Sequence, residues 1–209
     1  MVYDILYSNM LITVFILIIL LFSVILHELA HGSAALSLGD STAKDSGRLT
    51  LNPLKHLDFF GSFILPLSLF IITAGKGPVF GWAKPVPVNP FNFKDPKKGM
   101  LKVSLAGPGA NFLVAVFFGL IIRFIPLNIS FINFLGIIVF YNFFWGLFNL
   151  VPIPPLDGSH ILFGLLPERF SGLKMTLWQH RTLFLLLFIV FGMEWLFSIA
   201  ISLYSLLVG

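Results

Sequence analysis

The chain consists mainly of long apolar runs separated by short polar loops. A helix of about 20 apolar residues is long enough to cross the hydrocarbon core of a bilayer. One further run, at 59–74, is shorter and is interrupted by Pro66. The pattern predicts an all-α polytopic membrane protein with about four to five transmembrane helices and short extended loops. The longer runs cover residues 10–38, 103–125, 131–151 and 181–207.

The composition supports a membrane protein and limits the chemistry that the chain can perform. Hydrophobic residues make up 57% of the 209 residues and charged residues only 11%, whereas soluble domains carry about 25% charged residues. The net charge of +4 comes from basic residues in the loops and requires no nucleic-acid partner. Because the chain has no cysteine, a metal ion would have to be held by His, Asp, Glu or Asn.

We expect one integral membrane domain over residues 1–209, with a core at 10–165 and a C-terminal helix at 181–207. The first apolar run lacks the basic start and the small-residue cleavage site of a signal peptide, so we interpret it as a helix of the mature protein. The longest polar stretches are loops, which leave no room for a PDZ-like or other soluble module.

The distribution of charge bears on whether residues 59–74 cross the membrane. If they cross fully, basic residues fall on both sides of the bilayer. If the segment is re-entrant or interfacial, only Arg123 of the 13 Lys and Arg residues lies on the opposite face. The positive-inside rule expects that distribution of a cytoplasmic face. We therefore favour a re-entrant or interfacial segment.

Three ionisable residues lie close together in the first apolar run, in the stretch His27-Glu28-Leu29-Ala30-His31. Histidines four residues apart share one face of a helix, so both imidazoles can reach one metal ion. Glu28 stands beside the first of them, where its carboxylate can take a proton from water at the metal. Ionisable residues at membrane depth are costly, so they are functional candidates. The alternative is a chance match or a polar cluster that joins helices.

A catalytic zinc ion usually has three protein ligands and one water molecule. Asp157 is the leading candidate for the third ligand, because prolines at 152, 154 and 155 interrupt the preceding helix and Gly158 permits a turn. The alternative is that Asp157 caps the following helix. Asn149, about two helical turns earlier, could donate a hydrogen bond to an oxyanion or a substrate carbonyl.

Other acidic and histidine residues are also possible ligands. His160 is the next candidate, whereas His56 is interpreted as a satisfied histidine at the membrane interface and His180 as a loop residue. Glu194 lies in the last apolar run, where pairing with another helix is the simpler interpretation. The remaining candidates are Asp58 and Glu168.

Three stretches occur in the order seen in the site-2 proteases, the zinc metalloproteases that cut within the membrane. They are residues 27–31, residues 107–111 (Gly-Pro-Gly-Ala-Asn) and residues 149–158 (Asn-Leu-Val-Pro-Ile-Pro-Pro-Leu-Asp-Gly). The chain resembles this family from about residue 20 to residue 165. Residues 47–56 and 81–88 resemble its compact prokaryotic branch, which has no PDZ domain.

The resemblance implies that His27, His31 and Asp157 hold one catalytic Zn²⁺ ion, that Glu28 is the general base, and that Asn149 contacts the substrate or the oxyanion. It also implies an active site toward the cytoplasmic side of the cell membrane. The chain departs from larger members in two respects: no separate helix precedes the metal-bearing one, and the insertion at 59–74 is long.

Residues 80–93 contain too many prolines for a helix and are expected to be extended. We hypothesise that this segment accepts a locally unwound substrate by strand addition. Such pairing is one-sided, because proline has no N–H to donate. The expected substrate contacts are Trp82 and Val86 in this segment, together with Asn111.

These features favour an intramembrane zinc metalloprotease that hydrolyses peptide bonds in or near transmembrane segments. By resemblance, its substrates are single-span membrane proteins such as anti-sigma factors, cut in regulated intramembrane proteolysis. The alternative is a membrane transporter or channel that uses the same His/Glu/Asp cluster to move a metal or protons. The chain shows no inverted-repeat hydropathy of the common transporter kind. An inactive relative that only binds membrane proteins is a third possibility, and the intact Glu28 argues against it.

Overall fold

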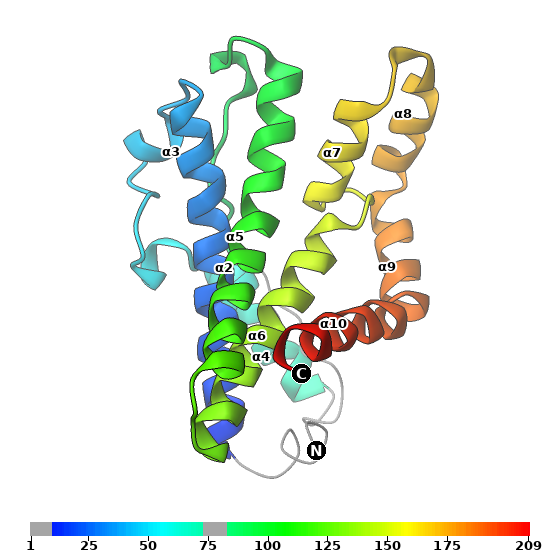
Figure 1. Ribbon diagram of the computed structural model, residues 1–209. Helices are drawn as coiled ribbons and strands as arrows, with labels where there is room; N and C mark the ends of the chain where they lie inside the picture. Colours follow the sequence, from blue (N-terminus) through cyan, green and yellow to red (C-terminus); the bar gives the residue numbers. More distant parts are fainter. Residues whose placement is uncertain (1–9, 73–82) are drawn as a thin grey trace.

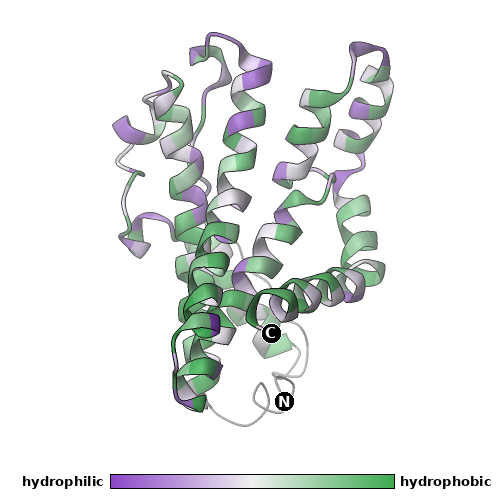
Figure 2. Cartoon of the chain, viewed as in Figure 1, coloured by the Kyte–Doolittle hydropathy of each residue, from purple (hydrophilic) through white to green (hydrophobic). Residues whose placement is uncertain are grey.

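The computed structural model describes residues 10–72 and 83–209, and every regular element within these ranges is helical. Three helices are long and apolar enough to cross a membrane: α2 (Met10–Ser37), α5 (Pro96–Phe124) and α6 (Ile129–Leu150) (Figure 1). Hydrophobic residues cover the shafts of these helices, and hydrophilic residues gather in the loops and helix ends at the top of the view (Figure 2). The all-α polytopic membrane fold is therefore confirmed.

The other helices in the described part of the chain are short. A fourth span is formed if two consecutive helices, Glu168–Gln179 and Arg181–Phe191, cross the membrane together as one bent span. The angle between these two helices is 73°. The short elements are α3 (Thr42–Asp45), a π-helical turn (Phe60–Ile64), α4 (Leu65–Ile72), α7 (Asp157–Leu165), α8 (Ser171–Gln179), α9 (Arg181–Phe191) and α10 (Met193–Val208), with 3₁₀ turns at Pro53–Lys55, Pro90–Asn92 and Glu168–Phe170.

Local sequence explains where α5 and α6 begin. Asp95 precedes α5, and its carboxylate accepts a hydrogen bond from the N–H of Lys98 (3.0 Å), with Pro96 in the first helical position. Asn128 precedes α6 and accepts from the N–H of Phe131 (3.0 Å) in the same way. These caps satisfy backbone donors that have no partner within the helix.

The packed core of the membrane domain lies where α5, α6 and α10 meet. Two glycines let α10 approach the longer helices closely. A Cβ atom on Gly119 would lie 2.2 Å from the Leu207 side chain, and one on Gly136 would lie 2.8 Å from the Tyr204 hydroxyl. The buried residues of this core are Ala115, Ile122, Val139, Phe140, Phe143 and Ala200.

The last apolar run differs from the single C-terminal helix predicted over 181–207. The structure has two helices, α9 and α10, which meet at Gly192. Glycine is a weak helix former because it has the most backbone freedom to lose. A helix that continued straight would lead α10 away from the core, whereas the break turns it across α5 and α6 (Figure 1).

The chain leaves α2 and enters α5 at the same end of the molecule. The Asp40 carboxylate, just after α2, accepts hydrogen bonds from the Asn89 N–H and the Asn92 side chain, each at 2.7 Å. The intervening chain therefore makes no net crossing. The helical stretch from Phe60 to Ile72 is about 20 Å long, short of the roughly 30 Å hydrocarbon core. For the described part of the segment, residues 59–72, both observations agree with the expectation of a re-entrant or interfacial segment at 59–74.

Asp40 is fully buried, and its hydrogen bonds perturb its acidity. Burial alone would raise the pKa of the carboxyl, but the hydrogen bonds from Thr42, Asn89 and Asn92 outweigh this effect and hold the pKa below its ordinary value of 3.8. A depressed folded-state pKa stabilises the fold above the unfolded-state value and ceases to do so as the pH falls through the folded-state value.

We therefore predict a specific acid dependence for Asp40→Asn. The substitution should lower the stability of the detergent-solubilised protein near pH 7 by about 2 kcal/mol, because it removes charge-assisted hydrogen bonds. The stability gap between the two proteins should stay constant from pH 7 to pH 5 and narrow below about pH 4. Thermal unfolding across this range measures the gap, and a gap independent of pH down to pH 3 would contradict the assignment.

The absence of cysteine in the sequence permits a direct test of topology. Single cysteines at the exposed positions Lys94 and Arg169 should react with a membrane-impermeant maleimide from the same side of the membrane. A cysteine at the exposed Pro126, between α5 and α6, should react only from the opposite side. Labelling of all three positions from one side would overturn the arrangement of α5 and α6.

Candidate metal centre and active site

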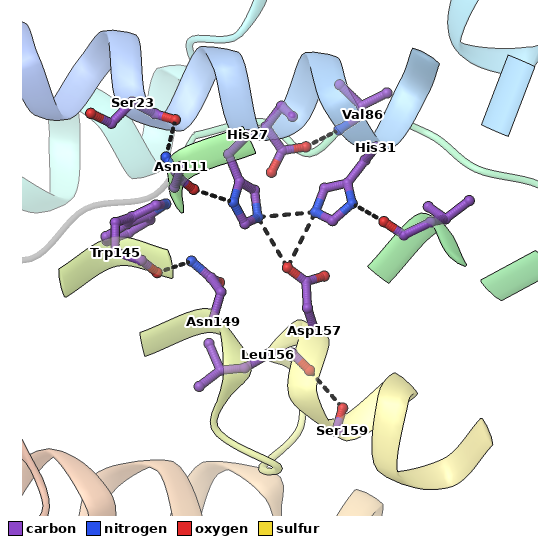
Figure 3. Close-up of polar contacts among 12 residues, drawn as sticks. Ser23, His27, His31, Val86, Asn111, Trp145, Asn149, Leu156, Asp157 and Ser159 are labelled. Carbon is purple, nitrogen blue, oxygen red and sulfur yellow. Dashed lines mark hydrogen bonds and ion pairs between the residues drawn. The ribbon is translucent and has the colours of Figure 1, made fainter. Parts of the chain in front are cut away.

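Two histidines from α2 and one aspartate from the start of α7 converge on a single point (Figure 3). The Nε2 atoms of His27 and His31 lie 2.9 Å apart. The Oδ2 atom of Asp157 lies 3.0 Å from the first nitrogen and 3.2 Å from the second. Both imidazoles are buried, with 3% and 8% exposure. The structure thus brings together the three residues that the sequence proposed as ligands.

The tautomer of His27 follows from the hydrogen bonds around it. The Asn111 side chain donates through Nδ2 to the Ser23 carbonyl (3.1 Å) and to the Asn142 side-chain oxygen (3.0 Å). Its Oδ1 is therefore an acceptor, so His27 must donate to it through Nδ1–H, at 2.7 Å. The Nε2 atom of His27 then carries a lone pair and no proton.

His31 is held in the same tautomer by a backbone group. Its Nδ1–H donates to the Val103 carbonyl at 2.7 Å, because a carbonyl can only accept. Both imidazoles therefore present an unprotonated Nε2 to the same point, and hydrogen bonding of the far ring nitrogen is the usual way in which proteins orient histidine ligands.

This arrangement of donor atoms fits a divalent metal ion. Two nitrogen lone pairs and a carboxylate oxygen face one another, and the Asp157 Oδ2 is buried without a hydrogen-bond donor. Such a cluster of acceptors is unfavourable unless a cation neutralises it. Three ligands of tetrahedral zinc, each about 2.0–2.1 Å from the ion, lie roughly 3.3–3.4 Å apart, close to the observed spacing. His27, His31 and Asp157 could therefore hold zinc and leave a fourth position open.

The backbone after α6 places Asp157. α6 ends at Leu150, six residues lead through the prolines, and α7 begins at Asp157 itself. The carboxylate makes no cap hydrogen bond to α7, so the helix-cap alternative finds no support. A Cβ atom on Gly158 would lie 2.1 Å from the Leu150 carbonyl oxygen, which shows that α7 begins directly against the end of α6. Only glycine fits this contact.

A second glycine lets α5 approach the two imidazoles. A Cβ atom on Gly107 would lie 2.5 Å from the His31 Nε2 and 2.7 Å from the His27 Cε1. The stretch at 107–111 therefore acts on the site twice: Gly107 makes room for the ligands and Asn111 orients one of them.

Asn111 has a different position from the one predicted for it. We expected a substrate contact, but the side chain is fully buried and its oxygen and both N–H groups are engaged within the protein. No polar group of Asn111 is left for a substrate. Its partner Asn142 was not singled out in the sequence, although a polar residue in an apolar span is itself a signal of a functional or packing role.

Glu28 and Val86 are directly linked. The Glu28 Oε2 accepts a hydrogen bond from the Val86 N–H at 2.7 Å (Figure 3). The Val86 side chain is buried against α2, where a Cβ atom on Gly32 would come within 2.9 Å of it. Val86, expected to contact substrate, thus contacts the predicted base. The other predicted contact in this segment, Trp82, lies outside the described residues.

Asn149 lies in the last turn of α6, half-buried beside the metal centre (Figure 3). Its side-chain Nδ2 donates to the Trp145 carbonyl at 3.0 Å. An amide nitrogen carries two hydrogens, so one N–H of Asn149 is still available to a ligand. The indole nitrogen of Trp145 is itself buried without an acceptor.

The remaining candidates do not join the ligand group in the described part of the chain. His160 is half-buried, with its ring centroid 6.4 Å from that of Trp178, and burial lowers its pKa. His56 is fully buried: its Nε2 lies 2.8 Å from the Thr50 carbonyl, but its Nδ1 has no hydrogen-bond partner, so the expected satisfied histidine is satisfied at one ring nitrogen only. Glu168 is exposed, 3.5 Å from the Lys174 ammonium. The other candidates are Asp58 before the π-helical turn, His180 between α8 and α9, and Glu194 in the first turn of α10.

Two imidazoles on the apolar α2, a carboxylate at the start of α7 and a neighbouring glutamate could together hold a metal ion, an arrangement typical of a metal-dependent hydrolase. Residues 126–190 match the model of peptidase family M50. The chain is 41% identical over 171 residues, covering 78% of this chain and 73% of the relative, to a Bacillus subtilis protein named "Putative zinc metalloprotease YwhC". The chain therefore belongs to peptidase family M50, the site-2 protease family of zinc metalloproteases.

Two further relatives carry similar names. A Mycolicibacterium smegmatis protein, "Putative zinc metalloprotease Rip2", is 38% identical over 149 residues, or 69% of this chain and 55% of the relative. "Zinc metalloprotease MJ0392" of Methanocaldococcus jannaschii is 34% identical over 83 residues, or 40% of this chain and 24% of the relative. No solved structure matches the chain significantly.

The hydrogen bond between Asn111 and His27 predicts how a substitution affects metal binding. Asn111→Ala should weaken zinc binding by about 10- to 100-fold, because His27 loses the acceptor that fixes its ring. Competition with a chromophoric chelator in detergent measures the affinity. Asn133→Ala removes the same kind of side chain near the start of α6, at the end of that helix away from Asn149 and Asp157, and should bind zinc as the wild type does. Equal affinities for Asn111→Ala and Asn133→Ala would show that Asn111 does not orient the ligand.

Proposed function

We propose that this metalloprotease hydrolyses peptide bonds in or near the transmembrane segments of membrane-anchored proteins. The observation that carries the proposal is the position of the site. The ligands His27 and His31 lie within the apolar α2, and the third ligand begins α7 directly against the end of the apolar α6. A protease whose catalytic groups lie on membrane-spanning helices can reach peptide bonds that a soluble protease cannot.

Each residue of the site has a part in the proposed reaction. His27, His31 and Asp157 would hold a single catalytic zinc ion, which when bound polarises a carbonyl and lowers the pKa of water. Glu28 accepts a proton from the attacking water and passes it to the leaving amine. The free N–H of Asn149 donates to the carbonyl oxygen of the scissile bond as negative charge develops on it.

A transmembrane substrate must unwind before cleavage, because a helix hides its carbonyls in internal hydrogen bonds. The segment at 84–89 could receive the unwound chain by strand addition. This segment is already anchored at its start, where the Lys84 N–H donates to the His56 carbonyl at 2.8 Å and Ala83 pairs with Leu57 in an antiparallel bridge. Pro85 and Pro87 offer only carbonyl acceptors and the Val86 N–H is held by Glu28, so over residues 85–87 a substrate strand could pair only by donating N–H groups.

We further propose that the protein lies in the cell membrane with its active site toward the cytoplasm. The loop after α2 and the start of α5 meet at one end of the molecule and are rich in lysine and arginine. Arg123 lies at the far end of α5, where its guanidinium donates to the carbonyls of Leu206 and Leu207 at 3.1 Å each. The positive-inside rule assigns the basic end to the cytoplasm. Substrates would be single-span regulators similar to anti-sigma factors.

The decisive experiment is cleavage of a labelled single-span membrane protein by purified enzyme in liposomes. Wild-type protein should cleave it, a chelator should abolish cleavage, and added zinc should restore it. Glu28→Gln should reduce the rate by about 10²- to 10⁴-fold, the usual contribution of a general base.

Two controls separate the proposal from its alternatives. Asp45→Asn changes an exposed carboxylate on α3 and should cleave at the wild-type rate. Equal rates for wild type and Glu28→Gln would indicate a contaminating protease. Absence of cleavage by zinc-loaded wild type, accompanied by zinc flux into the liposomes, would replace the protease by a transporter.

A further inference from the structure

We propose that Asp40 is a positioning residue for the reaction: it holds the segment at 84–89 so that the Val86 N–H orients the carboxylate of Glu28. This inference rests on the proposed function, in which Glu28 is the base. Asp40 is 12 positions from Glu28 in sequence and lies beyond the end of α2, so it acts through the segment and not by contact.

The Asp40 carboxylate accepts hydrogen bonds from two parts of the chain, the turn after α2 and the residues that follow the 84–88 stretch. Its Oδ2 accepts from the Asn89 N–H at 2.7 Å, and its Oδ1 accepts from the Asn92 side chain at 2.7 Å and from the Thr42 N–H at 3.1 Å. The carboxylate is fully buried, so these hydrogen bonds are not exchanged with water. A buried carboxylate that accepts from both parts ties the end of the 84–89 segment rigidly to the end of α2.

The segment is anchored at both ends, with the link to the base between them. The Lys84 N–H binds the His56 carbonyl at 2.8 Å, the Val86 N–H binds Glu28 at 2.7 Å, and the Asn89 N–H binds Asp40 at 2.7 Å. Because residues 85 and 87 are prolines, Val86 is the only donor among residues 85–87. A shift at Asn89 therefore moves the one N–H that reaches the base.

The base needs such a partner because a glutamate side chain has three freely rotating bonds. With one oxygen held by Val86, the other oxygen of Glu28 faces a limited range of directions and is free to take a proton. Misplacement of a catalytic group by about 1 Å can cost on the order of 100-fold in rate. Loss of the Asp40 anchor should therefore reduce turnover more than substrate binding.

The test is a double-mutant cycle between Asp40→Asn and Val86→Pro. Asp40→Asn keeps one side-chain oxygen and loses the other acceptor, whereas Val86→Pro removes the N–H and keeps an extended backbone. Each single variant should lower kcat by about 10- to 100-fold, with KM changed by less than about threefold. If Asp40 acts through the Val86 N–H, adding Asp40→Asn to Val86→Pro should lower kcat by less than twofold.

Matched variants separate this effect from general damage. Asp45→Asn removes an exposed carboxylate from α3, five residues after Asp40, and should leave kcat unchanged. Val86→Ala truncates the side chain but keeps the N–H, and should lose much less activity than Val86→Pro. Independent, multiplicative losses in the cycle would overturn the proposal, and so would a loss of kcat in Asp45→Asn equal to that in Asp40→Asn.

Hydrogen exchange gives a readout that does not depend on cleavage. A peptide that covers residues 84–89 contains few amides, so the exchange of Val86 can be resolved by mass spectrometry. Val86 should be protected in the wild type and exchange at least tenfold faster in Glu28→Ala and in Asp40→Asn. Unchanged protection in Asp40→Asn overturns the link. If the wild type shows no protease activity but the exchange pattern holds, the proposed function fails while the link between Asp40 and Glu28 stands.

Discussion

Three atoms with free electron pairs are held within 3.2 Å of one another in the interior of the molecule, and no donor lies between them. Such acceptors repel one another unless a cation joins them. The rest of the protein must therefore hold each of these side chains in position through contacts on the side away from the cluster. Asn111 on α5 fixes His27, the Val103 carbonyl fixes His31, and the turn after α6 fixes Asp157. α5 and α6 are thus as much a part of the metal centre as the helix that carries the histidines.

Much of this architecture could be predicted from local patterns in the sequence. The apolar runs predicted the ends of α2, α5 and α6 to within a few residues, except the start of α5, which lies seven residues earlier than the run. These helices are predictable because a bilayer crossing requires about 20 apolar residues. The i, i+4 histidines needed only helical periodicity to share a face. Asp157 needed one further argument, that prolines break a helix where a carboxylate must turn inward. These inferences depend on short-range geometry.

The features that could not be predicted depend on which parts of the chain meet. The orienting role of Asn111 could not be predicted because its partners, Ser23 and Asn142, are distant in sequence. The link between Val86 and Glu28 joins residues 58 positions apart, and nothing in either local stretch indicates it. The break at Gly192 could not be predicted, because one glycine in an apolar run is compatible with a continuous helix and only tertiary packing determines whether the helix breaks there.

The two glycines of the Gly-Pro-Gly stretch differ sharply in their surroundings. A single methyl group at Gly107 would collide with both imidazoles, whereas nothing lies within 4 Å of the position that a Cβ atom would take at Gly109. Two residues that look equivalent in the sequence therefore have unequal freedom to change. The structure has room for a side chain at position 109, whereas any side chain at position 107 would displace the imidazoles of His27 and His31.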